Sequence, residues 1–232
     1  MAEITAALVG KLRAMTNAGL MDCKKALTES NGELEAAVDL LRKKGIATAA
    51  KRAGREAREG VIAQHIQTGA RVGTLVEVNC ETDFVAKNEV FGTFCNEIAK
   101  TLTENPNVDL EATRAAQVAK MGENIQITRH QRLEVSGNGL VAAYIHTGAK
   151  VGVLVEVGAG KEATVANEEF KQLARDITLQ IAAANPTSVS REEVDAALIE
   201  REKAIATDQV KDKPAHAITK IIEGKLDKFF QT

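Results

Sequence analysis

The chain has 232 residues, and 44% of them are apolar, which is enough to build one large or two small packed cores. Its formal net charge is −2, and it holds one Tyr, six Phe and no Trp. A chain without a broad basic surface or base-stacking aromatics is poorly suited to general nucleic-acid binding, so we expect no direct nucleic-acid partner.

Cysteine content and hydropathy predict the compartment of the chain. The three cysteines, Cys23, Cys80 and Cys95, are odd in number and lie in apolar-patterned segments, which favours reduced, buried thiols over disulfides. Residues 1–4 include an acid, and no stretch approaches the ~18 uncharged apolar residues of a membrane span. We therefore expect a soluble, cytoplasmic chain with no membrane partner.

Residues 4–44 are predicted to form three short helices, separated by Gly19 and by the pair Asn31-Gly32. The apolar residues that indicate the helices fall into three groups: Ile4, Leu8, Leu12 and Met15; Met21, Ala26 and Leu27; and Leu34 through Leu41. Three short helices with apolar residues in the first loop, Ala18-Gly-Leu-Met21, resemble a ubiquitin-associated-like module. Such modules bind protein surfaces through that loop.

Residues 43–58 carry a local net charge of +5. The charged residues are Lys43, Lys44, Lys51, Arg52, Arg55 and Arg58 against Glu56. Two interpretations stay open: a solvated linker, helical or not, and a basic strip that contacts an acidic partner surface. The three-helix module and its basic linker are predicted as a first domain, residues 1–55.

Eleven residues from Thr68 to Val78 recur 79 residues later as Thr147 to Val157, with 9 of the 11 positions identical. Each copy follows a run with period-2 alternation. The four predicted strands are Val61–Ile66, Val72–Val78, Leu140–Ile145 and Val151–Val157. Two such runs joined by a glycine-containing loop indicate an antiparallel hairpin, so the chain contains two copies of one hairpin.

Each hairpin is followed by an apolar stripe at helical spacing. The stripe residues are Phe91, Phe94, Ile98 and Leu102 in the first copy and Phe170, Leu173, Ile177 and Ile181 in the second. A further strand is expected at Ile125–Val135, and further helices at residues 192–206 and 213–230. The predicted class is α+β, with a three-helix ubiquitin-associated-like module and two duplicated hairpin-and-helix subdomains with antiparallel sheets, residues 56–137 and 138–232.

Enzyme motifs are weak in this sequence. The segment Gly158–Ala163 fits a relaxed G-x-G-x-x-A pattern, yet its strand belongs to a hairpin, and Glu162 puts negative charge where phosphate would bind. The four histidines show no metal-ligand spacing. Cys80 lies beside Glu81 and Asp83, which raise the pKa of its thiol, the wrong direction for a nucleophile. We expect no catalytic residue, cofactor or metal site, so a binding protein is favoured by elimination.

The two copies differ most between the second strand and the helix. The first copy reads Cys80-Glu-Thr-Asp-Phe-Val85 and the second reads Ala159-Gly-Lys-Glu-Ala-Thr164. One interpretation is structural: Thr82 or Asp83 caps the helix, and Phe84 packs in the core. However, the second copy keeps the apolar stripe and has Ala163 in place of Phe84, so the shared fold does not require the ring. We therefore predict that Phe84 is presented to a partner.

Four segments together resemble the bacterial elongation factor Ts family. They are Thr82-Asp-Phe-Val-Ala-Lys87, Arg13 with Thr16-Asn-Ala-Gly-Leu-Met-Asp-Cys-Lys-Lys-Ala-Leu27, Gly122-Glu-Asn-Ile125, and His146-Thr-Gly-Ala-Lys-Val-Gly-Val-Leu154. The resemblance covers essentially the whole chain, in order. It implies guanine-nucleotide exchange on elongation factor Tu, with no covalent chemistry of the chain's own. A non-catalytic adaptor and a small-molecule enzyme remain the alternatives.

The resemblance also implies which residues contact the GTPase. Asp83 and Phe84, within Thr82-Asp-Phe-Val85, take the family's role of inserting near the magnesium site. The residues that match GTPase-holding positions of the N-terminal module are Arg13, Leu20, Met21 and Lys24, and His146 matches a core contact. Leu20 stands where some relatives have Met, and longer members continue past Phe229-Phe230 into a module whose contacts are not carried over. A homodimer within a larger complex is left open.

Overall fold

The computed structural model describes residues 3–16, 18–211 and 214–230. Met1 and Asn17, which belong to segments considered above, lie outside these ranges. The chain consists of two compact units, Met1–Thr178 and Leu179–Thr232. The finer division into residues 1–55, 56–137 and 138–232 stays a prediction.

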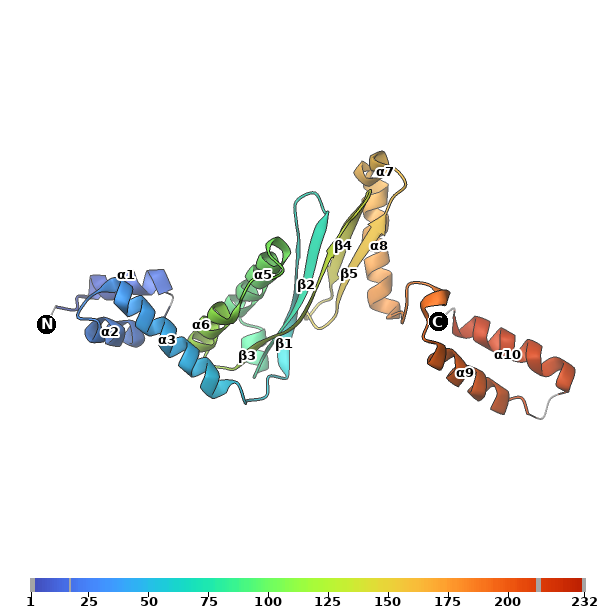
Figure 1. Cartoon of the computed structure of the whole chain (residues 1–232), viewed down its shortest axis with the longest axis horizontal. Helices are drawn as coiled ribbons and strands as arrows, with labels where there is room; N and C mark the ends of the chain where they lie inside the picture. Colours follow the sequence, from blue (N-terminus) through green and yellow to red (C-terminus); the bar gives the residue numbers. More distant parts are fainter. Residues whose placement is uncertain (1–2, 17, 212–213, 231–232) are drawn as a thin grey trace. The chain divides into compact units, whose positions relative to one another are not determined.

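The first unit begins with the three predicted helices, α1 (Ala6–Thr16), α2 (Leu20–Glu29) and α3 (Leu34–Arg52), drawn in blue in Figure 1. Their shared core consists of Val9, Leu12, Cys23, Ala26, Leu27 and Ala37. Met15 and Met21 were expected in these stripes, but their side chains are 58% and 63% exposed. Both residues lie within the predicted helices, but beside the α1–α2 loop and past the packed middle of the two helices, and Met21 was also predicted as a partner contact, which requires exposure.

The third helix is longer than predicted and includes much of the basic segment. It continues beyond Leu41 to Arg52, because no Gly-Pro or Asn-Gly break interrupts the run of Lys, Ala and Thr. Gly45 and Ala49 are buried on one side of it, against α6 (Glu111–Met121), a helix that the sequence analysis did not anticipate. Four of the basic residues, Lys43, Lys44, Lys51 and Arg52, therefore lie on a helix that packs against α6, and Arg55 and Arg58 follow its end.

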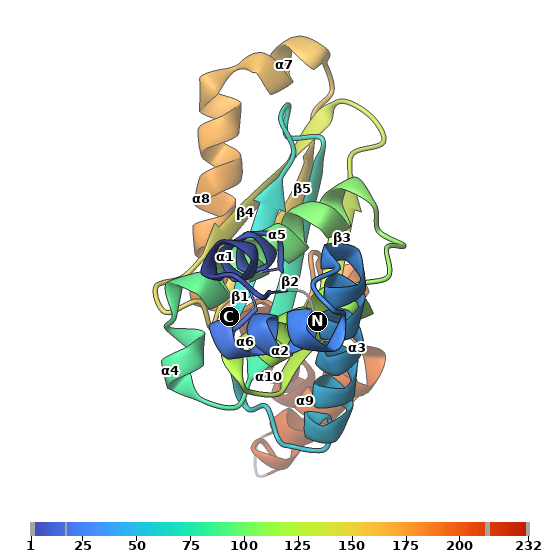
Figure 2. The same ribbon diagram turned by 90° about the vertical axis from the view of Figure 1, so that its left-hand side faces the viewer.

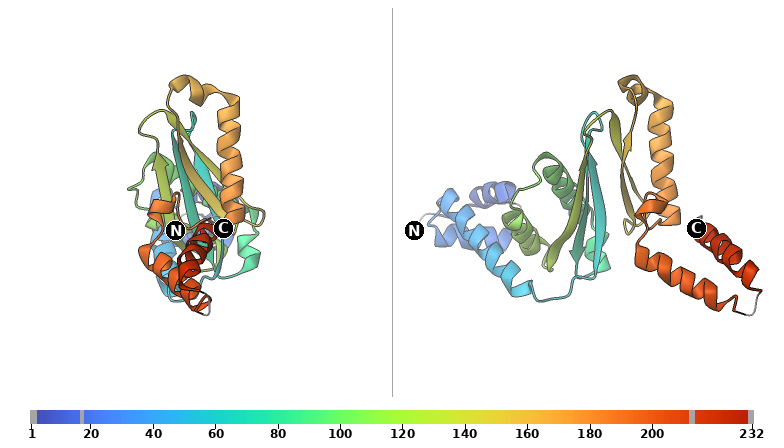
Figure 3. Two further views of the ribbon diagram at one scale, coloured as in Figure 1. Left: turned by 90° about the vertical axis from the view of Figure 1, so that its right-hand side faces the viewer. Right: turned by 45° about the vertical axis from the view of Figure 1, so that its right-hand side comes forward.

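Two antiparallel sheets form the middle of the first unit. The first has the order β1-β2-β3, with β1 (Glu59–Ile66), β2 (Val72–Cys80) and β3 (Ile125–Glu134), and the second pairs β4 (Gly139–Ile145) with β5 (Gly152–Gly158). Helix α5 (Glu89–Glu104) covers the first sheet, and α8 (Glu168–Ala184) lies against the second. Figure 1 and Figure 3 show these layers in the order α5, sheet, sheet, α8. Both predicted hairpins and the predicted strand at 125–135 are confirmed.

The duplicated sequence has the same strand register in both copies. Ile66 pairs with Gly73 in the first hairpin, and Ile145 pairs with Gly152 in the second. Each member of the second pair lies 79 residues after its counterpart, the same offset as in the sequence repeat. The repeat therefore encodes one hairpin geometry twice.

The two sheets are joined by a reciprocal pair of hydrogen bonds. The Ile62 N–H donates to the carbonyl of Ala149 at 2.8 Å, and the Val141 N–H donates to the carbonyl of Ala70 at 2.7 Å. Ala70 and Ala149 occupy the hairpin turns, each with a φ of 53°. Because each bond is the repeat-equivalent of the other, a local twofold pseudosymmetry relates the two hairpins.

Glycine is required where the two sheets touch. A Cβ at Gly152 would lie 2.7 Å from Ile62 Cγ2 and 3.1 Å from the Cδ1 atoms of Leu75 and Ile145. We expect Gly152→Ala to lower the free energy of unfolding by about 1–3 kcal/mol, because the sheets must move apart. On α5, where a Cβ at Gly92 would meet no atom within 4 Å, Gly92→Ala is expected to raise it by about 0.5–1 kcal/mol. Urea unfolding of both variants tests this, and equal effects would contradict a close sheet-to-sheet contact.

The two helix stripes differ in burial. In α5 the stripe residues Phe91, Phe94, Ile98 and Leu102 are all buried, as predicted. In α8, Leu173 is the repeat-equivalent of Phe94 but is 52% exposed, so its predicted burial is wrong. In the first copy, α6 and β3 complete the core around α5. Among the residues that the structure describes, the second sheet has two strands, β4 and β5, so α8 lacks this additional cover.

In the second unit, α9 (Ala196–Asp208) packs against α10 (Ala215–Phe229). The first predicted helix starts later than expected, because residues Arg191–Glu193 form a separate 3-10 turn. The Arg191 guanidinium forms an ion pair with Asp227 at 2.9 Å and lies 4.3 Å from the centre of the Phe230 ring. None of the helices in the described part of the chain combines the length and hydrophobicity that a bilayer crossing needs.

Candidate functional site

The Thr82–Val85 segment forms a capped corner between β2 and α5. Asp83 begins the single-turn helix α4 (Asp83–Ala86), which Figure 2 shows at the edge of that view. The hydroxyl of Thr82 accepts a hydrogen bond from the Val85 N–H at 3.3 Å, so Thr82 is the predicted cap. The Phe84 side chain is 82% exposed. The interpretation that Phe84 packs in the core is therefore wrong, since the cap turns its ring outward.

The four residues of this corner divide into two kinds. Thr82 is held by internal hydrogen bonds, and Val85 packs against the core beneath the first sheet. The Asp83 carboxylate is 49% exposed and pairs with the Lys87 ammonium at 2.7 Å. That hydrogen-bonded ammonium holds the pKa of Asp83 below its ordinary value, so the group is charged at neutral pH. Asp83 and Phe84 are thus the side chains available to a partner.

The second copy of the corner shows what the fold itself requires. Helix α7 (Glu162–Ala166) follows β5 as α4 follows β2. Its cap position is Lys161, whose side chain makes no capping hydrogen bond, and the exposed residue equivalent to Phe84 is Ala163. The corner therefore forms without an aromatic ring, so the fold does not require the ring of Phe84.

The predicted contacts of the N-terminal module all lie on its surface. Arg13 is exposed near the end of α1, and Lys24 is exposed on α2. Leu20 and Met21, in the first turn of α2, are 54% and 63% exposed. Large apolar side chains beside basic ones at a helix start suit a contact with another protein.

His146 lies apart from those residues, at the turn between β4 and β5. Its side chain is exposed, and its Nδ1 atom is 2.9 Å from the Tyr144 hydroxyl. Its backbone N–H donates to the Val151 carbonyl at 2.9 Å, which closes the hairpin turn. The predicted contacts therefore lie at three places in the first unit: the α1–α2 region, the α4 corner and the β4–β5 turn.

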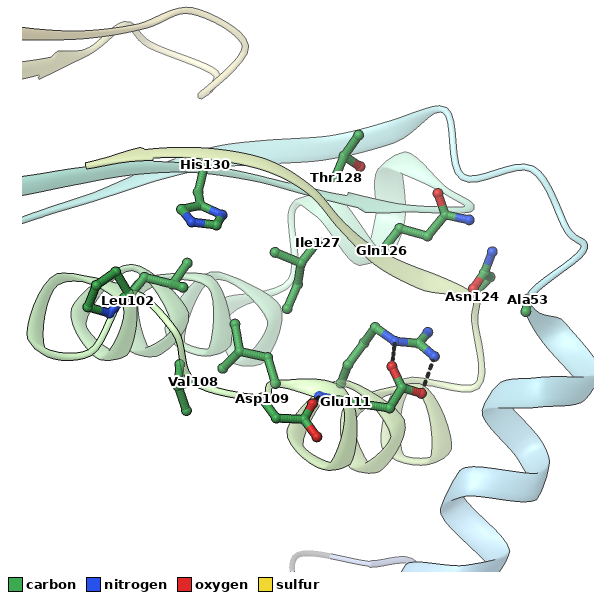
Figure 4. Close-up of a pocket in the computed structure, with 13 residues that line it drawn as sticks. Ala53, Leu102, Val108, Asp109, Glu111, Asn124, Gln126, Ile127, Thr128 and His130 are labelled. Carbon is green, nitrogen blue, oxygen red and sulfur yellow. Dashed lines mark hydrogen bonds and ion pairs between the residues drawn. The ribbon is translucent and has the colours of Figure 1, made fainter. Parts of the chain in front are cut away.

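The described residues of the first unit line at least two clefts. One, of about 890 Å³, lies between the N-terminal module and helices α5 and α6. The other, of about 680 Å³, runs beneath β3 and is shown in Figure 4, with His130 above and Asp109 below. Arg114 supplies its cationic side chain, but Arg114 is paired with Glu111 at 2.7 Å and donates to the carbonyl of Ile125. Because that charge is already engaged, this cleft is a poor phosphate site.

The cysteines and the possible metal ligands are side chains of types that carry out chemistry in many proteins. Cys23, Cys80 and Cys95 are all buried and free. Burial raises the pKa of Cys95 to about 12 and that of Cys80 to about 11, with the Glu123 carboxylate as the second cause for Cys80. The predicted direction for Cys80 is right, but the cause is burial and not its chain neighbours. Within the described ranges no cluster of three His, Cys, Asp or Glu is arranged to hold a metal ion.

The chain is similar to known proteins along its whole length. A family model described as "Elongation factor TS" matches residues 81–232. Elongation factor Ts of Symbiobacterium thermophilum is 45% identical over 240 residues, covering 100% of this chain and 79% of that protein. Elongation factor Ts of Nostoc sp. is 42% identical over 98% of this chain and 79% of its own, and that of Nautilia profundicola is 45% identical over 99% and 79%. The chain therefore belongs to the elongation factor Ts family.

Proposed function

We propose that the chain is a guanine-nucleotide exchange factor for elongation factor Tu, and that Asp83 and Phe84 insert near the magnesium and phosphate site of that GTPase. Membership of the elongation factor Ts family supports the role in protein biosynthesis. The observation that carries the residue assignment is the 82% exposure of Phe84 on a corner whose duplicate has Ala163. An exposed ring that the fold does not use is suited to binding a partner.

The free energies require more than one contact. An exchange factor binds the empty GTPase more tightly than the loaded one, and by linkage it weakens nucleotide binding by the same factor. A ten-thousandfold effect needs about 5.5 kcal/mol of differential binding, whereas burying one Phe contributes about 1.5–3 kcal/mol. The remainder is assigned to the exposed surfaces that hold the GTPase, namely Arg13, Leu20, Met21, Lys24 and His146.

Phe84 and Asp83 have different roles in this proposal. The Phe84 ring wedges between switch elements of the GTPase. The Asp83 carboxylate, once it leaves Lys87, adds negative charge beside the phosphates and competes for the hydrogen bonds and the cation that hold them. Both effects weaken nucleotide binding without any covalent step, so the chain is assigned no enzymatic chemistry and no cofactor.

A nucleotide-release assay tests the general function. Elongation factor Tu is loaded with fluorescent GDP and mixed with excess unlabelled GDP and increasing amounts of the chain. We expect release to accelerate with chain concentration and then saturate. A stoichiometric complex without faster release would instead indicate an adaptor. Nucleotide binding by the chain alone, abolished by Lys161→Ala, would indicate a small-molecule enzyme.

The proposal places the chain in the cytoplasm, where translation takes place, with no membrane or direct nucleic-acid partner. Whether two copies join in the complex with elongation factor Tu is addressed by light scattering of the purified complex. A mass equal to one copy of each protein would exclude the homodimer.

A further inference from the structure

One carboxylate from a distant part of the chain fastens the base of the α4 corner. Glu123 lies in the loop between α6 and β3. Its Oε2 atom accepts hydrogen bonds from the backbone N–H groups of Glu81 at 3.1 Å and Thr82 at 3.0 Å. Its Oε1 atom accepts from the Thr82 hydroxyl at 2.6 Å, and that hydroxyl in turn accepts from the Val85 N–H. A single side chain thus binds three donors immediately before Asp83.

The loop that carries Glu123 is itself held by the corner. Glu81 Oε1 accepts from the backbone N–H of Asn124 at 2.6 Å, so each segment offers a carboxylate to the backbone of the other. Asn124 is completely buried, and its side-chain amide donates to the Arg55 carbonyl at 2.7 Å. The Arg55 guanidinium lies 3.4 Å from Glu81 Oε2. The two segments therefore form a reciprocal clamp, which we define as Glu81, Thr82, Glu123 and Asn124.

The duplicated corner provides an internal comparison for this clamp. The positions equivalent to Glu81 and Thr82 are Gly160 and Lys161, which cannot offer the same groups. Helix α7 nevertheless forms there, without a side-chain capping bond. The strand-to-helix corner thus folds without a clamp, and the clamp is present at the copy that carries the exposed aromatic ring.

We propose that Glu123 is a positioning residue for nucleotide exchange, holding the backbone at Thr82 so that Asp83 and Phe84 have their binding geometry before the partner arrives. This inference rests on the proposed function of the corner. An unclamped corner would need to be ordered during binding, which reduces the free energy available to displace nucleotide. Charge-assisted bonds to backbone N–H groups are well suited to the task, because they are stronger than neutral ones.

Glu123→Gln is the informative substitution. Glutamine keeps the size of the side chain but turns one carboxylate oxygen into an NH₂ group, which faces donors and cannot accept from them. We expect the maximal rate of GDP release from elongation factor Tu to fall about tenfold, because the corner would then have to be ordered during binding. A tenfold change corresponds to about 1.4 kcal/mol of free energy. The concentration for half-maximal release should change less, because the exposed α1–α2 surface is untouched. Glu134→Gln, which removes an exposed carboxylate paired with Arg132, is the matched control and should behave as the unaltered chain.

A double-variant comparison separates positioning from general stability. In a chain that already carries Asp83→Ala and Phe84→Ala, Glu123→Gln should change the release rate by less than about twofold, because no side chain remains to be positioned. Thr82→Val, which keeps the shape of the side chain but removes its hydroxyl, should reproduce the loss of rate if Glu123→Gln fails to fold.

Two results would overturn the inference while leaving the proposed function in place. One is an unchanged release rate for both Glu123→Gln and Thr82→Val. The other is an equal loss of rate from Glu123→Gln with and without Asp83 and Phe84, which is what a purely structural role predicts. If the chain with Asp83→Ala and Phe84→Ala releases GDP as fast as the unaltered chain, the proposed function of the corner is wrong, and the inference about Glu123 fails with it.

Discussion

Phe84→Ala is expected to slow chain-catalysed release of GDP from elongation factor Tu by roughly ten- to a hundredfold, while the chain remains as stable as before. Burial of a Phe ring in a partner contributes about 1.5–3 kcal/mol, and each 1.4 kcal/mol is about a factor of ten. The ring is 82% exposed in the free chain, so its removal creates no cavity there. Exposed substitutions of this kind change the free energy of unfolding by no more than about 0.5 kcal/mol.

Stopped-flow measurement of labelled-GDP release, at several concentrations of the chain, would give this rate. Val189→Ala is a suitable control, because Val189 is an apolar side chain that is 95% exposed and has no part in the proposed contact. It should leave release unchanged. Release at the unaltered rate from the Phe84 variant would remove the ring from the mechanism and leave exchange to the other surfaces.

Phe91→Ala is expected to have the opposite profile, with a large loss of stability. Phe91 is completely buried in the core between α5 and the first sheet, and its ring centre lies 6.4 Å from that of Phe94. Large-to-small changes of buried Phe cost about 3–5 kcal/mol, because the lost burial is compounded by an unfilled cavity. That loss is a large part of the roughly 5–15 kcal/mol that stabilises a typical domain.

Urea unfolding followed by circular dichroism tests this second prediction. Phe84→Ala is its matched control, because the same atoms are removed from an exposed position seven residues earlier in the chain. A midpoint shift of similar size in both variants would contradict the assignment of Phe91 to the core and Phe84 to the surface. Below the urea concentration at which Phe91→Ala unfolds, its corner should still be intact and its GDP release close to normal.

Much of the fold could be predicted because its signals are local. Alternation identified both hairpins, and the stripe from Phe91 to Leu102 identified the buried face of α5. Helix α6 was missed because its apolar face is built from small residues such as Ala115, which pack against Gly45 and Ala49 of α3. Small side chains give a weak hydrophobic pattern, although they allow two helices to pack closely.

The internal repeat made part of the candidate site predictable. Comparison of Phe84 with Ala163 indicated that the ring was not needed for folding, and the ring is exposed as that comparison implied. The same comparison could not foresee the ion pair of Asp83 with Lys87, although their spacing of four residues on a helical turn permits it.

The two hairpins, their common register and the exposed aromatic corner were predictable from the order of the amino acids, because each depends on spacing within one short segment or on comparison of two copies. Three features emerged from the packed fold: β3 pairs with β2, the two sheets exchange the Ile62 and Val141 hydrogen bonds, and Glu123 binds the backbone of Thr82 from 41 positions away. Neither the strand and helix periodicities nor the 79-residue repeat specifies which of these residues meet. Their meeting depends on how packed elements bring distant loops together, and that is a property of the whole fold.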